Sequence, residues 1–130
     1  MFNLLLVMTG GAIGSALRYL FGQASFRLLG PGWPWGTLGV NIIGGLVMGL
    51  FAGWLAARAQ ANVLLGGEQI RLFFAVGVLG GFTTFSSFSL DAMLMIERGE
   101  LVSAASYALI SVFASIFALA VGLHIMRAVA

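Results

Sequence analysis

An uncharged stretch near the middle of the chain holds polar residues where a membrane helix is ordinarily apolar. Residues 72–90 carry no charged side chain, and the stretch is long enough to cross a bilayer. Its centre contains two adjacent glycines, two threonines and two serines, in the order Gly80-Gly81-Phe82-Thr83-Thr84-Phe85-Ser86-Ser87-Phe88. Adjacent glycines favour a break in a helix, and Thr or Ser can cap the start of a new one. The motif therefore predicts a broken helix, which is tolerated at membrane depth only inside protein or beside a wet cavity.

A break of this kind offers groups that bind ions of either sign. We expect the first half to end near Gly80 with unpaired carbonyls, and the second half to begin near Thr84 with free N–H groups. The carbonyls suit a hard cation such as Na⁺, whereas the N–H groups suit an anion. The alternative is a Gly-Thr kink that only aids packing.

Hydroxyl and amide groups recur in the other apolar stretches. Tyr107, Ser111 and Ser115 are spaced four apart, which places them on one helical face and predicts a polar track. The alternative is that each serine bonds the carbonyl four residues before it. The amide of Asn41 offers two donors and would be costly against lipid. Either an interhelical hydrogen bond or a polar lining would satisfy it.

Each aromatic or charged residue near the motif has two possible roles. Phe85 and Phe88 are three apart on one face, and their positive ring edges suit a small anion; lipid contact or core packing is the alternative. Arg18 closes the first apolar stretch, where it either reaches the headgroups or gathers anions in a vestibule. Asp91 either pairs with an arginine or lines the same vestibule.

The elements that must position these residues are membrane spans. Of the 130 residues, 61% are hydrophobic and 8% are charged, whereas a soluble domain is about 25% charged. We therefore predict an all-α membrane protein with four transmembrane helices, the third of them broken, in a single domain that covers residues 1–130. Each span meets the required length of about 20 residues. The predicted spans are residues 2–22, 35–57, 71–96 and 101–126.

Several function classes are excluded by what the sequence lacks. The net charge of +2 is too small to suggest a nucleic-acid partner. The chain has no cysteine, which excludes disulfides, thiolate metal sites and cysteine nucleophiles. No HExxH motif or Ser-His-Asp set is present, so we predict that the protein is not an enzyme. No span has a central carboxylate, so a proton-coupled pump has no obvious proton carrier.

The arginines give no clear orientation in the membrane. With four spans, three arginines fall on each side, so the chain has no bias and we predict that it inserts both ways; one orientation that wins weakly is the alternative. Pairs of glycines four apart, such as Gly10/Gly14 and Gly45/Gly49, permit close helix approach either within the chain or between two chains. Opposite insertion would allow a closed, antiparallel two-fold dimer.

The sequence resembles the Fluc (CrcB) family of fluoride channels over its whole length. The resemblance rests on the break motif, which continues to Ser89, on the Tyr107/Ser111/Ser115 stripe and on two further motifs. These two are Gly10-Gly11-Ala12-Ile13-Gly14-Ser15-Ala16-Leu17-Arg18 and Gly36-Thr37-Leu38-Gly39-Val40-Asn41. Leu is common in the family at the position of Phe82, and Glu is frequent at the position of Asp91, so these two positions depart from its pattern.

The resemblance implies a dual-topology antiparallel homodimer in the bacterial cytoplasmic membrane. It implies two pores that export fluoride passively, and a structural Na⁺ held at the dimer interface by the backbone carbonyls of Gly80 and Thr83. Phe85 and Phe88 would line the fluoride pore, Asn41 would supply its amide, and Arg18 would lie in a vestibule. The hydroxyls that the resemblance assigns to the pore are those of Ser86, Ser87, Tyr107, Ser111 and Ser115.

A small dual-topology transporter of hydrophobic cations is the main alternative. Such a protein also needs four spans in a short chain, but it requires an acidic residue in the first span. Residues 1–17 contain none.

Overall fold

The computed structural model describes residues 1–61 and 66–129, and their fold is entirely helical. Four helices are long and apolar enough to cross a membrane, so the chain is an all-α, multi-pass membrane protein as predicted. In chain order the elements are α1 (Phe2–Leu29), α2 (Trp35–Gln60), α3 (Gly67–Arg71), the π-helical segment η1 (Leu72–Leu79), α4 (Gly80–Phe82), α5 (Phe85–Glu97) and α6 (Leu101–Val129). The third span consists of α3, η1, α4 and α5.

The helices continue beyond the apolar stretches that predicted them. The first was expected to end at Gly22 but runs to Leu29, because nothing in the intervening sequence prevents helical hydrogen bonding outside the bilayer. It ends at Gly30, whose φ of 76° lies in the left-handed region that favours glycine and whose N–H donates to the carbonyl of Phe26. Pro31 follows and cannot continue the helix.

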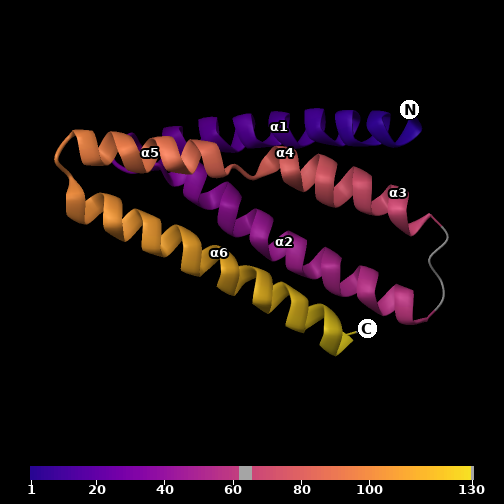
Figure 1. Cartoon of the computed structure of the whole chain (residues 1–130). Coiled ribbons are helices and arrows are strands. Elements are labelled where there is room, and N and C mark those ends of the chain that lie inside the picture. The colour runs from indigo at the N-terminus through magenta and orange to yellow at the C-terminus, as the bar shows by residue number, and fades with distance from the viewer. Residues whose placement is uncertain (62–65, 130) are drawn as a thin grey trace.

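The bundle is built from two closely packed helix pairs (Figure 1). The first span lies along η1 and α4, and α2 lies along α6. The turn from α1 to α2 and the turn from α5 to α6 lie at one end, and the two chain termini lie at the other. Both pairs are held by glycines that bring backbones together.

The glycine contacts are made within the chain, as the packing alternative predicted. A Cβ built on Gly10 would lie 2.5 Å from the carbonyl oxygen of Phe73 in η1, and one built on Gly45 would lie 2.6 Å from the carbonyl oxygen of Ser115 in α6. A Cβ at either position therefore has no room unless a backbone moves. Small residues thus set the separation of helices that have little else to drive their association in lipid.

The break in the third span does not occur at the glycines. The expectation that the adjacent glycines cause it is wrong, because the helix continues through both of them and ends at Phe82. The extended residues are Thr83, with φ −83° and ψ 159°, and Thr84, with φ −154° and ψ 118°. Gly81 instead serves packing, since a Cβ there would lie 2.5 Å from the carbonyl oxygen of Gly11.

The segment before the break is wound more loosely than an ordinary helix. Over η1 the hydrogen bonds follow the π-helical pattern, and the N–H of Gly80 donates to the carbonyl of Ala75, five residues earlier. Hydropathy does not distinguish π from α winding, so this feature was not predicted. Such π segments occur often at functional sites in proteins.

The turn between α5 and α6 is short and polar. Gly99 takes a φ of 77°, and the guanidinium of Arg98 donates to the carboxylate of Glu100 with an Nε–Oε1 distance of 3.0 Å. This hydrogen bond lowers the pKa of Glu100 below its ordinary value. Both side chains are exposed, so the pair adds little to stability.

Candidate functional site

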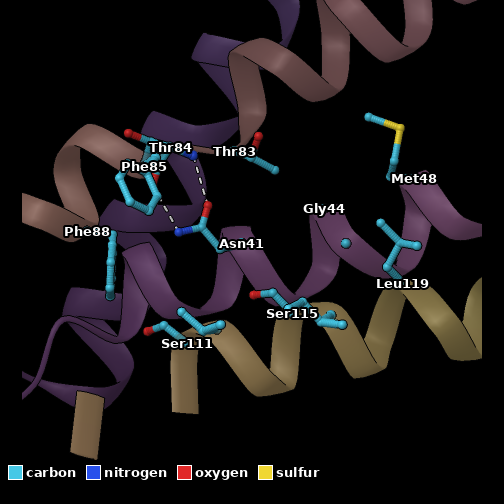
Figure 2. Close-up of a pocket in the computed structure, with 13 residues that line it drawn as sticks. Asn41, Gly44, Met48, Thr83, Thr84, Phe85, Phe88, Ser111, Ser115 and Leu119 are labelled. Atoms are coloured by element: carbon cyan, nitrogen blue, oxygen red, sulfur yellow. Dashed lines mark hydrogen bonds between the residues drawn. The ribbon is translucent and has the colours of Figure 1, made fainter. Parts of the chain in front are cut away.

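Asn41 makes two hydrogen bonds to the extended backbone at the break, a pair of bonds that we call the clasp (Figure 2). Its Oδ1 accepts a hydrogen bond from the N–H of Thr84 at 2.8 Å, and its Nδ2 donates to the carbonyl of the same residue at 3.0 Å. Because a backbone N–H can only donate, the orientation of the amide is fixed. The predicted interhelical hydrogen bond of Asn41 is therefore present, and its second Nδ2 hydrogen is not used by these two bonds.

The clasp redirects one backbone donor away from the helix. In an uninterrupted α-helix the N–H of Thr84 would donate to the carbonyl of Gly80, four residues earlier. Here that N–H donates to Asn41 instead. Gly80 is exposed, and within residues 66–129 no backbone hydrogen bond joins its carbonyl to Thr84.

The hydroxyls around the break satisfy local groups. Thr84 caps α5, since its Oγ1 accepts a hydrogen bond from the N–H of Ser87 at 3.1 Å. The same oxygen donates to the Ser87 hydroxyl at 3.1 Å and lies 3.3 Å from that of Ser86. The hydroxyl of Thr83 donates to the carbonyl of Leu79 at 2.9 Å. These bonds stabilise the break and use the hydroxyl hydrogens of Thr83 and Thr84.

A cavity of about 380 Å³ opens beside the clasp, where polar groups from three spans meet apolar side chains. Figure 2 shows the clasp on one side of it and the serines of α6 on the other. None of its lining residues is charged. The residues that line it are Asn41, Gly44, Gly45, Met48, Thr83, Thr84, Phe85, Phe88, Ser111, Val112, Ser115, Ile116 and Leu119.

Ser111 and Ser115 line this cavity, and each carries an unpaired, buried hydroxyl. The Oγ atoms of both are buried, and no hydrogen-bond partner for either lies within the described parts of the chain. The alternative in which each serine bonds the carbonyl four residues earlier is therefore not what the structure has. An unpaired buried hydroxyl is costly, so two in register along one helix are unusual unless a ligand or water meets them.

Tyr107, the first member of the predicted stripe, is placed differently. It is 0% exposed, and its hydroxyl donates to Oδ2 of Asp91 at 3.2 Å. It belongs to a buried cluster with Leu38, Met95 and Ala104. The stripe thus has one paired hydroxyl at its end and two unpaired hydroxyls beside the cavity.

The two phenylalanines lie together at the cavity but differ in exposure. Their ring centroids are 5.4 Å apart with an interplanar angle of 47°. Phe85 is 77% exposed, whereas Phe88 packs against Tyr107 with a centroid distance of 5.4 Å. Core packing, one of the two predicted alternatives, therefore applies to Phe88 in part, and both rings line the cavity.

A second, more polar cavity of about 570 Å³ lies near the ends of α1 and α5. Arg18 and Asp91 are the charged residues that line it, so the structure brings these two residues to one cavity. Its other polar residues include Ser15, Thr37 and Ser87. Thr84 lines both cavities and so joins the two regions.

Three of the predicted site residues, Gly80, Ser86 and Tyr107, line neither cavity. Ser86 and Gly80 are exposed, whereas Thr83 lines the first cavity. Two other lining residues, Thr37 and Trp33, were not predicted as part of the site. For Thr37 a signal was present, since it lies four residues before Asn41 on the same helical face.

The amino-acid sequence matches the model of a known family over residues 5–123, described as CrcB-like protein, Camphor Resistance (CrcB). The chain belongs to the CrcB family. This confirms the family that the motifs predicted.

Relatives match the chain over nearly its full length. A protein of Rhizobium leguminosarum bv. trifolii (strain WSM2304) is 52% identical, with 100% of both chains covered. Proteins of Agrobacterium fabrum (strain C58 / ATCC 33970) and Mesorhizobium japonicum (strain LMG 29417 / CECT 9101 / MAFF 303099) are 53% and 50% identical, with 98% of each chain covered. Each of these three CrcB relatives is named a fluoride-specific ion channel, FluC.

Proposed function

We propose that this CrcB protein is a fluoride-selective channel, and not an enzyme, that exports fluoride passively across a bacterial cytoplasmic membrane. The observation that carries the proposal is the cavity at the break, where the hydroxyls of Ser111 and Ser115 are unpaired and no lining residue is charged. Free donors without a fixed positive charge bind a small anion without trapping it. The names of the relatives support the same function.

The lining residues have complementary parts in this function. Fluoride is small and strongly hydrated, so a narrow path must replace its water with several donors at once. The serine hydroxyls and the second N–H of Asn41 supply conventional donors, and the edges of Phe85 and Phe88 supply a weak positive potential. Arg18 raises the local concentration of anions in the second cavity. Width and donor geometry then favour fluoride over chloride.

A partner chain completes the pore in this proposal. Phe85 is 77% exposed although it lines the cavity, and Ser86 and Gly80 beside it are exposed as well. An antiparallel copy would cover this face and give two equivalent pores in one homodimer. The balanced arginines allow the required opposite insertion. Reporters for each side of the membrane, fused to the C-terminus, should then both give signal, and signal from one side alone would contradict dual insertion.

A structural Na⁺ at the centre of the dimer is part of the proposal. The residues fit a cation, because the clasp takes the N–H of Thr84 and leaves the carbonyl of Gly80 without that partner. No cluster of three His, Cys, Asp or Glu side chains that could hold a metal occurs in the described residues. The family resemblance assigns the ligands to the backbone oxygens of Gly80 and Thr83, and carbonyl oxygens suit a hard cation. Replacement of all Na⁺ by a large organic cation should lower dimer stability and fluoride flux together; unchanged values after verified ion exchange would contradict the site.

The experiment that tests the function is ion efflux from liposomes that contain the purified protein. Fluoride-loaded liposomes should discharge fluoride when a cation ionophore is added, and chloride-loaded ones should not. Equal chloride flux would contradict selectivity, and flux that requires a proton gradient would contradict passive conduction. Proton-coupled uptake of a hydrophobic cation would support the alternative transporter.

A further inference from the structure

Trp33 is turned into the protein rather than toward the headgroups. It lies in the turn between α1 and α2, where a tryptophan ordinarily marks the membrane interface. Here it is half-buried, and its indole N–H donates to the hydroxyl of Ser103, 70 residues later in the chain, at 2.9 Å. An interfacial tryptophan does not need such a bond, because water and headgroups satisfy its N–H.

The same indole also contacts Tyr107, one turn further along α6. Ser103 and Tyr107 are four apart on one helical face, so a single side chain can reach both. The two rings meet edge to face, with centroids 5.8 Å apart and an interplanar angle of 75°. Trp33 therefore holds Tyr107 from one side while Phe88 packs against it with a centroid distance of 5.4 Å.

Tyr107 in turn fixes the position of the Asp91 carboxylate, which lines the second cavity. Its hydroxyl donates to Asp91, which lines that cavity together with Arg18 and Trp33. A carboxylate released from Tyr107 would be free to approach Arg18 and cancel its charge, or to repel an anion directly. The position of Tyr107 therefore decides how much positive potential the cavity keeps.

We propose that Trp33, clamped by Ser103, is a positioning residue for the anion path, because it holds Tyr107 and thereby keeps the Asp91 carboxylate away from Arg18. The proposal rests on the proposed function for its effect on flux. The clamp itself does not, because it is a contact that can be measured without fluoride.

The first arm of the test measures fluoride efflux from liposomes. Trp33→Phe keeps an aromatic ring and removes the indole N–H, and Ser103→Ala removes its acceptor. Each should slow efflux by about three- to tenfold, the range that corresponds to one lost hydrogen bond. The double variant should be no slower than either single variant, and Ser103→Thr should retain the wild-type rate. Trp54→Phe, at the other end of α2, is the matched control and should also retain it.

The second arm separates positioning from general structural damage. Asp91→Asn removes the charge that the clamp restrains, so in the Trp33→Phe background it should restore part of the lost efflux. A merely structural role for Trp33 would not be corrected in this way. Wild-type efflux in Trp33→Phe, additive losses in the double variant, or no recovery with Asp91→Asn would each overturn the positioning role.

The third arm measures the clamp without any ion flux. In ¹⁵N-labelled protein the indole N–H signal that Trp33→Phe removes is that of Trp33, and its hydrogen exchange should be several-fold faster in Ser103→Ala than in wild type. Unchanged exchange would overturn the clamp. If the unmodified protein carried no fluoride, both the proposed function and the role of Trp33 in the anion path would be wrong. Slow hydrogen exchange of the Trp33 indole N–H would still establish the clamp.

Discussion

The third and fourth spans both contribute polar residues to the lining of the same cavity, but they do so in opposite ways. In the third span the backbone is interrupted at Thr83 and Thr84, and the hydroxyls there are used to satisfy neighbouring groups. In α6 the helix is continuous, and the hydroxyls of Ser111 and Ser115 are left unpaired. A membrane helix can therefore keep its backbone hydrogen bonds and leave side-chain hydroxyls unpaired. Alternatively, it can break its backbone hydrogen bonds and use its side-chain hydroxyls to satisfy the backbone groups at the break. The four predictions below test how each part of this arrangement contributes.

The largest effect is expected at Asn41, which supports the broken span from outside. Asn41→Ala leaves the N–H of Thr84 without its partner, which costs about 1–3 kcal/mol, and removes one hydrogen bond to the carbonyl of Thr84, worth about 0.5–1.5 kcal/mol. That carbonyl is not left unsatisfied, because the carbonyl of an N-cap residue also accepts the first hydrogen bond of its helix. Denaturation in detergent micelles should show a loss of about 2–4 kcal/mol in the free energy of unfolding. Asn3→Ala, on an exposed amide at the start of α1, is the control; equal losses in the two variants would show that the clasp is not what supports the break.

The adjacent glycines should respond very differently to the same added methyl group. A Cβ at Gly81 meets the carbonyl oxygen of Gly11 at 2.5 Å, whereas the nearest neighbour of a Cβ at Gly80 is the carbonyl oxygen of Ala75 at 3.7 Å. Gly81→Ala should therefore cost about 1–3 kcal/mol through overpacking. Gly80→Ala should cost little in the same denaturation experiment. Similar losses of unfolding free energy in the two variants would indicate that both glycines contribute to the break itself.

The cap of α5 should give a smaller loss. Thr84→Ala removes the side-chain oxygen that accepts from the N–H of Ser87, and loss of such a cap costs about 1 kcal/mol. Thr84→Ser keeps the oxygen and should retain nearly all of the stability. A Thr84→Ser variant as unstable as Thr84→Ala would mean that the methyl group, and not the cap, matters.

The smallest effect on stability is expected at the serines of α6. Ser111→Ala and Ser115→Ala each remove a buried hydroxyl that has no partner in the described structure, so the change in unfolding free energy should stay within about 0.5 kcal/mol. Fluoride efflux should nevertheless fall by about ten- to a hundredfold, since a hydrogen bond to an ion is worth about 1.5–3 kcal/mol. Destabilisation without an effect on efflux would show that these hydroxyls are structural.

The sequence predicted the parts of this arrangement that depend on local chemistry. Hydropathy located the four spans, and four-residue spacing placed Ser111 and Ser115 on one face. The break was found within a few residues of its true place, but its cause was assigned to the glycines and not to the threonines. Helical φ and ψ are accessible to glycine, so only the packing against α1 reveals what Gly81 does.

The sequence did not predict which residues become partners when they lie far apart in the chain. Asn41 and Thr84 are 43 residues apart, and Trp33 and Ser103 are 70 apart. Each pair requires the helices to be packed before its partner can be chosen, so no local pattern marks it. A tryptophan in a turn between two spans ordinarily marks the headgroup region, and hydropathy does not reveal the tertiary contact that Trp33 makes instead.

The loose winding of η1 bears on how this chain can change in length during evolution. Removal of one residue between Leu72 and Ala75 would convert π to α geometry there, so that the loss is taken up within η1. The register of Gly77 and Gly81 against α1 would be kept, and the break isolates α5 from the change. Single-residue gaps among homologous sequences should therefore gather ahead of Gly77, whereas an insertion between Thr84 and Ser89 would turn Phe85 and Phe88 away from the serines and be eliminated.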